Sequence, residues 1–149
     1  MEPIEFPSDF IEFLRLLNAN AVEYLLVGGF AVAIHGYPRA TADIDVWVAR
    51  HEANADRIVA ALTEFGFEVP ALTSALFVEP DTIVRMGNAP MRIELMTSID
   101  GVEFGDCAKR AIVHAVDSTP IPVIGLDDLK VNKRASGRNK DLDDLDNLP

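Results

Sequence analysis

Residues 27–49 read VGGFAVAIHGYPRATADIDVWVA and contain two adjacent glycines, a short apolar run and two aspartates that open a strand-like segment. The pattern predicts a strand that ends at Gly28 and Gly29, a helix that stops at Gly36, and a second strand that begins near Asp43. Two carboxylates on an apolar strand repel each other unless a cation or a basic partner neutralises them. The stretch therefore predicts a local fold and a charged site together.

The flanking sequence alternates helical and strand-like patterns. Apolar residues recur at a helical period over residues 8–18, where Ser8 or Asp9 is the expected N-cap, and over residues 52–67, where Gly66 is the expected stop. The remaining expected elements are a hairpin of strands at 82–87 and 91–97 around Gly87-Asn88-Ala89-Pro90, a short helix at 103–110, strands at 111–117 and 121–124, and a final helical segment from Leu126.

This order predicts an α+β (mixed α/β) fold in which helices flank a mixed sheet, and the length favours one domain over residues 1–149. The net charge of -11 disfavours a broad electrostatic surface for nucleic acid. No apolar run is long enough for a membrane span, and the acidic, proline-containing N-terminus does not resemble a signal peptide. The single Cys107 excludes an internal disulfide and is expected to be a buried apolar residue. We therefore expect a cytoplasmic protein.

Asp43 and Asp45 should project from the same face of their strand, because side chains on a strand alternate between its two faces. Two such carboxylates lie about 6 to 7 Å apart and can converge on one cation. Ile44 and its apolar neighbours would then face the core. Mg²⁺ suits this arrangement, and Mn²⁺ is the substitute, because Mg²⁺ takes hard oxygen ligands and is often completed by substrate phosphates.

A third acid is expected to hold a second metal ion or to activate the attacking group. Glu94 is the best candidate, because it lies in the middle of the strand-like segment MRIELMT, where a solvated charge is least expected. Asp81, Asp100 and Glu103 are weaker candidates at turns or strand ends.

The glycines supply a complementary feature. A Gly28-Gly29 turn between a strand and a helix lets the backbone approach a ligand closely, and a helix N-terminus favours a phosphate. The stretch could therefore hold the phosphates of a nucleotide at the glycines and its metal at Asp43 and Asp45.

Basic and polar residues near these motifs have two readings each. Arg39 could contact a phosphate or orient Asp43, or it could be a loop arginine that pairs with any nearby acid; Thr41 lies at an alternate position beside it. A basic cluster could neutralise a triphosphate, with Lys133 and then Lys140 as the leading candidates, or it could be a solvated helix balanced by acids. The cluster consists of Lys130, Lys133, Arg134, Arg138 and Lys140. His35 is expected to end a helix and Trp47 to pack against the sheet.

LLVGGFAVAIHGYPRATADIDVWV, with RIELMTSIDGVEF downstream and the tail LKVNKRASGRNKDLDDLDNL, resembles the polymerase-β-type nucleotidyltransferase superfamily. The sequence is most similar to the compact bacterial branch that includes AbiEii-like toxin proteins. The resemblance implies that Gly28 and Gly29 form the phosphate turn and that Asp43, Asp45 and Glu94 are the catalytic metal ligands. Gly29 stands where many members have a serine, and Glu94 where Asp is commoner.

The resemblance implies a metal-dependent transfer of a nucleoside monophosphate from an NTP to a hydroxyl of a protein, an RNA end or a small molecule. It also implies a toxin–antitoxin context with a cognate antitoxin or regulator as partner. An alternative is a catalytically inactive module on the same fold that senses nucleotides or binds a partner. A third reading is a protein that binds metal without nucleotide.

Overall fold

The structure is a computed structural model that describes residues 5–87 and 92–149. Within these ranges, six strands form one mixed sheet in the order β3-β4-β2-β1-β6-β5. Strand β2 runs antiparallel to β1 and parallel to β4, and β1 runs parallel to β6. The strands are β1 Tyr24–Val27, β2 Asp43–Val48, β3 Ile83–Met86, β4 Arg92–Met96, β5 Ile112–Val116 and β6 Thr119–Val123. The expected α+β fold with a mixed sheet is confirmed.

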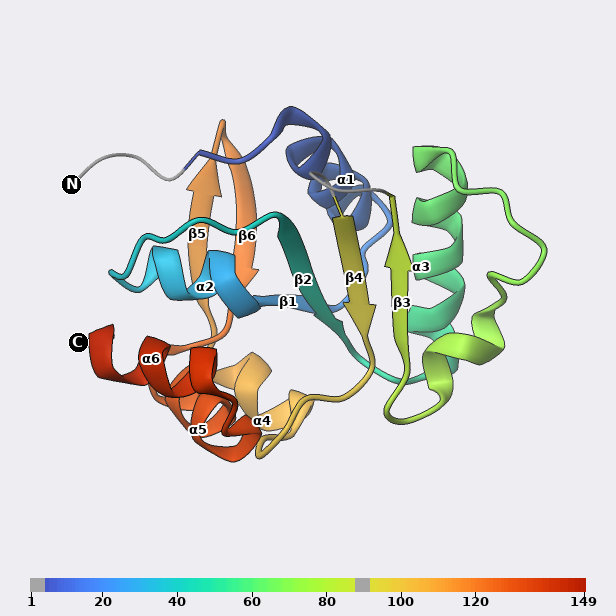
Figure 1. The fold of residues 1–149 in the computed structure, drawn as a ribbon. Helices are drawn as coiled ribbons and strands as arrows, with labels where there is room; N and C mark the ends of the chain where they lie inside the picture. Colours follow the sequence, from blue (N-terminus) through green and yellow to red (C-terminus); the bar gives the residue numbers. More distant parts are fainter. Residues whose placement is uncertain (1–4, 88–91) are drawn as a thin grey trace.

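Helices flank this sheet (Figure 1). They are α1 Ser8–Ala19, α2 Gly28–Ile34, α3 Glu52–Phe65, the 3-10 helix η1 Ser74–Val78, α4 Phe104–Lys109, α5 Leu126–Ser136 and α6 Asn139–Asn147. The helical segment expected from Leu126 is confirmed, but it consists of two helices, because Gly137 adopts a left-handed φ of 65° and separates α5 from α6. Among the described residues, none of these helices is both long and apolar enough to cross a lipid bilayer.

The alternation of β2 divides its side chains between the core and the pocket described below. Ile44, Val46 and Val48 are fully buried, whereas Asp43 and Asp45 on the other face are only partly buried. The period-two reading of β2 is therefore confirmed.

Helices α1 and α3 pack against each other through an edge-to-face contact of Phe13 with Phe65, whose ring centroids lie 5.3 Å apart.

The helix ends follow local chemistry. Gly66 ends α3 with a φ of 107°, as the sequence predicts. The N-cap of α1 is Pro7, so the expectation of a cap at Ser8 or Asp9 is wrong; both residues lie inside the first turn. Proline is compatible with this position because it pre-sets its backbone angle and needs no hydrogen-bond partner for a missing N–H group.

The hairpin of β3 and β4 positions the third acid. The two strands are antiparallel, with Arg85 opposite Glu94 and Met86 opposite Ile93. Residues 88–90 of the expected turn lie outside the described residues. Because β4 also pairs with β2, the hairpin carries Glu94 to the strand that bears the two aspartates.

Candidate active site

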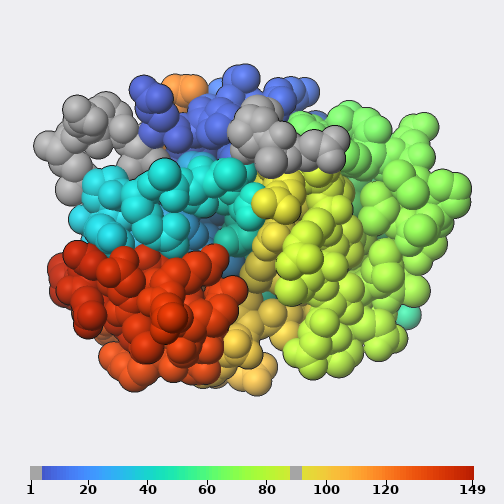
Figure 2. Space-filling model, viewed as in Figure 1, coloured from blue at the N-terminus to red at the C-terminus, as the bar shows by residue number. Residues whose placement is uncertain are grey.

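A pocket of about 550 Å³ opens where the sheet meets the first turn of α2 and the two C-terminal helices. Figure 2 shows it as a hollow between the red C-terminal helices and the yellow-green hairpin. Its lining includes the leading candidates for catalysis and nucleotide binding: Gly28, Gly29, Arg39, Thr41, Asp43, Asp45, Glu94, Lys133 and Lys140. The fold therefore gathers these residues at one place; their roles stay predictions.

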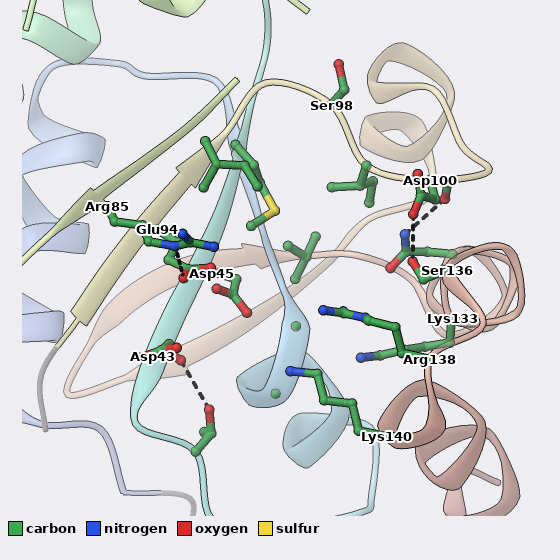
Figure 3. Close-up of a pocket in the computed structure, with 18 of the residues that line it drawn as sticks. Asp43, Asp45, Arg85, Glu94, Ser98, Asp100, Lys133, Ser136, Arg138 and Lys140 are labelled. Carbon is green, nitrogen blue, oxygen red and sulfur yellow. Dashed lines mark hydrogen bonds and ion pairs between the residues drawn. The ribbon is translucent and has the colours of Figure 1, made fainter. Parts of the chain in front are cut away.

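The three acids come from two neighbouring parallel strands. Asp45 on β2 lies opposite Glu94 on β4 in the strand register, and Asp43 projects from the same face two positions away. Figure 3 shows the three carboxyl groups side by side in the pocket. Further along this face of β2, Trp47 is covered edge-on by Phe104 of α4, with ring centroids 5.1 Å apart, so it packs as the sequence predicts.

Gly28 makes room for Asp45. Its φ of +67° is left-handed, and a Cβ added there would lie 2.1 Å from Asp45 Oδ2. Likewise, a Cβ at Gly29 would lie 2.8 Å from Thr41 Oγ1, which itself donates to the carbonyl oxygen of Asp43. The glycines thus let the side chains of Asp45 and Thr41 approach the backbone closely. The sequence predicts a phosphate at this position.

Asp45 carries the most perturbed carboxyl group of the three. Burial, followed by its hydrogen bond with Glu94 and the charges of Glu94 and Asp43, raises the pKa of Asp45 to about 7. Its Oδ1 atom is buried and has no hydrogen-bond partner within the described ranges. A buried carboxylate oxygen beside two other acids is unfavourable unless the group is protonated or a positive charge approaches it.

Two arginines neutralise the other acids. Arg85 Nε donates to Glu94 Oε1 at 2.8 Å, and Arg92 Nε donates to Asp43 Oδ1 at 3.2 Å. Burial raises the pKa of Glu94, but the hydrogen bonds from Arg85 and Asp45 outweigh it and lower that pKa overall. The described part of the chain contains no group of three or more His, Cys, Asp or Glu side chains arranged to hold a metal ion.

The donor set nevertheless fits a hard divalent cation. Three carboxylates share one face of the sheet, and Mg²⁺ or Mn²⁺ binds such oxygen ligands without needing sulfur or nitrogen. The unpartnered Oδ1 of Asp45 is a free ligand position. Asp43, Asp45 and Glu94 are therefore the residues that could hold the ion.

Lys133 lies in the wall of the pocket but already forms ion pairs with two aspartates of α6. Its Nζ lies 3.1 Å from Asp141 Oδ1 and 3.0 Å from Asp144 Oδ2, and all three side chains are buried. Burial raises the pKa of Asp141 and Asp144, but hydrogen bonds from basic partners outweigh it and lower both pKa values overall. Lys133 thus joins α5 to α6 in this structure.

Arg39 also belongs to this network. Its Nε and Nη2 donate to the two carboxylate oxygens of Asp144 at 2.8 and 2.9 Å. Arg39 therefore pairs with a nearby acid, as one of its two readings expects. The expectation that it orients Asp43 is wrong. This pair ties the loop before β2 to α6.

Sequence reasoning missed part of the pocket wall. Arg85 was not singled out, although an arginine in an alternating strand that forms a hairpin with MRIELMT was a usable signal. On the far wall, Asp100 accepts hydrogen bonds from Ser136 Oγ to its carboxylate and from Asn132 Nδ2 to its carbonyl, at 3.0 and 2.9 Å. Arg138 and Lys140 of the basic cluster extend from the C-terminal segment toward Asp45 (Figure 3).

The remaining candidates divide by position. Asp81 lines the pocket with Asp100, whereas Glu103 is the N-cap residue of α4 and lies outside it. His35 follows α2, and its Nε2 lies 2.7 Å from the carbonyl oxygen of Ile124, consistent with a helix-end residue. Cys107 is buried, as the sequence predicts.

The fold is similar to that of a protein from Thermotoga maritima whose crystal structure is described as a "putative nucleotidyltransferase". The TM-score is 0.63 at 20% identity, over 92% of this chain and 88% of the other. No curated protein matches the sequence. Residues 7–149 match the family described as "Nucleotidyl transferase of unknown function (DUF2204)", and this chain therefore belongs to that family.

Proposed function

We propose that this chain transfers a nucleoside monophosphate from an NTP to an acceptor hydroxyl and releases pyrophosphate. The observation that carries the proposal is the pairing of Asp45 with Glu94 across β2 and β4, with Asp43 on the same face and the whole trio in one large pocket. Membership of a nucleotidyl transferase family supports the reaction class. Fold similarity alone would not, since one fold hosts many reactions.

Asp43, Asp45 and Glu94 would hold Mg²⁺ or Mn²⁺. The cation would neutralise charge on the phosphates and lower the pKa of the acceptor hydroxyl. The protein's own part is positioning. The absence of a side chain at Gly28 leaves room for Asp45, and the cross-strand register keeps Glu94 beside it.

The nucleotide phosphates would lie between the acids and the C-terminal segment. Lys140 and Arg138 are exposed residues of the pocket lining, and the charge of Lys140 lowers the pKa of Asp45. Gly28, Gly29 and Thr41 remain candidates for nucleotide contact. Arg39 and Lys133 would touch the nucleotide only by leaving the aspartates with which they now pair.

The acceptor would be a protein side chain, an RNA end or a small molecule. The support for a macromolecular acceptor and for a toxin–antitoxin role, with a cognate antitoxin or regulator, is the sequence resemblance to the AbiEii-like branch. A catalytically inactive nucleotide sensor is the second candidate, favoured by the ion pairs that Arg85 and Arg92 form with two of the acids.

Pyrophosphate release from labelled ATP, GTP, CTP and UTP, with Mg²⁺ or Mn²⁺, tests the proposal. We expect Asp45→Asn to reduce the rate roughly a thousandfold or more, because it removes charge that holds the cation. Asp56→Asn, an exposed position on α3, is the matched control and should retain the rate. Metal-dependent nucleotide binding without turnover would instead support the sensor.

A further inference from the structure

Arg85 forms a row with two of the acids across three adjacent strands. The strand register aligns Arg85 on β3 with Glu94 on β4, and Glu94 with Asp45 on β2. Figure 3 shows the guanidinium of Arg85 beside the carboxyl groups of Glu94 and Asp45. Glu94 therefore lies between the guanidinium of Arg85 on one side and the second acid, Asp45, on the other.

The pair is built for exchange rather than for stability. The Arg85 side chain is 63% exposed, whereas that of Glu94 is 15% exposed. Within residues 5–87 and 92–149, the bond from Nε to Glu94 is the one hydrogen bond that Arg85 makes through its side chain. For a pair whose arginine is exposed, we expect an effect of about fivefold on an equilibrium constant.

We propose that Arg85 is a displaceable counter-ion, which neutralises Glu94 until a divalent cation replaces it and then binds the phosphates of the incoming nucleotide. The inference rests on the proposed function. Arg85 lines the same pocket as the acids and the glycines, so its guanidinium needs only a side-chain rotation to reach a bound anion. A guanidinium can donate two parallel hydrogen bonds to a phosphate. The bond to Glu94 uses only the Nε atom of Arg85.

Arg92 does not share this position. It pairs with Asp43 at 3.2 Å, but it does not line the pocket. The two arginines therefore differ in the property that the inference needs, which is access to the space where a nucleotide would lie. Binding of the cation and of the nucleotide would then be coupled through Arg85. The cation releases Arg85 for the phosphates, and the nucleotide, by binding Arg85, leaves Glu94 free for the cation.

Titration of the 149-residue chain with Mn²⁺ alone, followed by electron paramagnetic resonance of the free ion, tests the competition between Arg85 and the cation. We expect Arg85→Gln to bind Mn²⁺ about two- to fivefold more tightly than the unsubstituted protein, because the competing charge is gone. Arg57→Gln removes the same charge from an exposed position on α3 outside the pocket and should leave the affinity unchanged.

The binding of phosphates by Arg85 is tested with the α,β-methylene analogues of ATP, GTP, CTP and UTP at saturating Mn²⁺. We expect Arg85→Gln to bind the preferred analogue roughly tenfold more weakly, because a charge-assisted hydrogen bond to phosphate is lost. Arg85→Lys should be intermediate, since lysine keeps the charge without the planar fork. If Arg85 only stabilised the fold, Arg85→Gln would bind both Mn²⁺ and the analogue more weakly. Tighter Mn²⁺ binding together with weaker analogue binding therefore identifies the exchange.

The outcomes separate this inference from the function on which it rests. Absence of Mn²⁺ binding to the unsubstituted protein, or binding that Asp45→Asn leaves intact, would overturn both. Binding that Asp45→Asn abolishes and Arg85→Gln does not tighten would overturn the inference alone, as would unchanged analogue binding. Should Arg85→Gln lose its far-ultraviolet circular dichroism signal, Arg85→Met keeps the aliphatic stem and serves in its place.

Discussion

The C-terminal helices and the strands that carry the acids both contain ion pairs of similar length, but the pairs of Lys133 in the C-terminal helices are shielded from water. Lys133 Nζ lies 3.1 Å from Asp141 and 3.0 Å from Asp144, and these side chains are 5%, 1% and 1% exposed. Arg92 lies 3.2 Å from Asp43, with side chains 43% and 30% exposed. Contact distance alone therefore does not distinguish the two regions.

Burial decides what each region can do. A buried charge that loses its partner is left in a medium that solvates it poorly, whereas an exposed charge is solvated by water. The network around Lys133 therefore fixes α6, together with the Arg39 pair that ties α6 to the loop before β2. The arginines beside Asp43 and Glu94 can exchange partners at little cost. One region is a framework and the other can respond to a ligand.

Lys133→Met should produce the largest effect. We expect the free energy of unfolding to fall by about 3 kcal/mol, the lower end of the range for breaking a buried pair, because Arg39 and Arg138 still contact the two aspartates. Equilibrium unfolding in urea measures the change.

Lys109→Met, at an exposed position at the end of α4, is the control and should change the free energy of unfolding by no more than about 0.5 kcal/mol. Equal losses in the two variants would contradict the division between a framework and an exchangeable region.

Gly28→Ala tests whether the pocket also has a rigid part. A left-handed residue with a Cβ costs about 1 to 2 kcal/mol, and a Cβ at this site would also lie 2.1 Å from Asp45 Oδ2. Displacing Asp45 adds an overpacking cost of about 1 kcal/mol or more. We therefore expect a loss of about 2 to 3 kcal/mol in urea unfolding, together with weaker Mn²⁺ binding.

Gly66→Ala is the matched variant, because Gly66 is also left-handed, at φ +107°, but a Cβ there meets nothing within 4 Å. It should lose only the backbone part, about 1 to 2 kcal/mol, and retain Mn²⁺ affinity. If both glycine variants weaken Mn²⁺ binding equally, close packing of Gly28 against Asp45 does not position the acid.

Local periodicity was sufficient to predict much of the fold and the acid trio. The alternation of DIDVWV assigned Ile44 to the core and Asp45 to the other face, and a lone glutamate in MRIELMT identified Glu94. These predictions need only the geometry of a strand and the cost of burying an unpaired charge. The structure then places Glu94 opposite Asp45.

Pairings between distant segments could not be predicted in this way. The sequence ranks Lys133 ahead of Lys140 for nucleotide binding, whereas the structure buries Lys133 in α5 and exposes Lys140 in α6, beyond the break at Gly137. The partner of Arg39 is 105 positions away along the chain. Such contacts depend on tertiary packing, on which neither hydrophobic period nor residue type gives information.

Arg92→Gln should have the smallest effect and so defines the comparison most sharply. Its pair with Asp43 has almost the same length as the Lys133 pair, yet we expect a loss of no more than about 0.5 kcal/mol in urea unfolding, because water already solvates both groups. The loss should shrink further at 1 M salt, where the screening length falls to about 3 Å. The Lys133→Met loss should persist at that salt concentration, because a buried network is screened far less. Two losses of similar size, or two losses that salt reduces equally, would show that exposure does not separate the framework from the arginines beside Asp43 and Glu94.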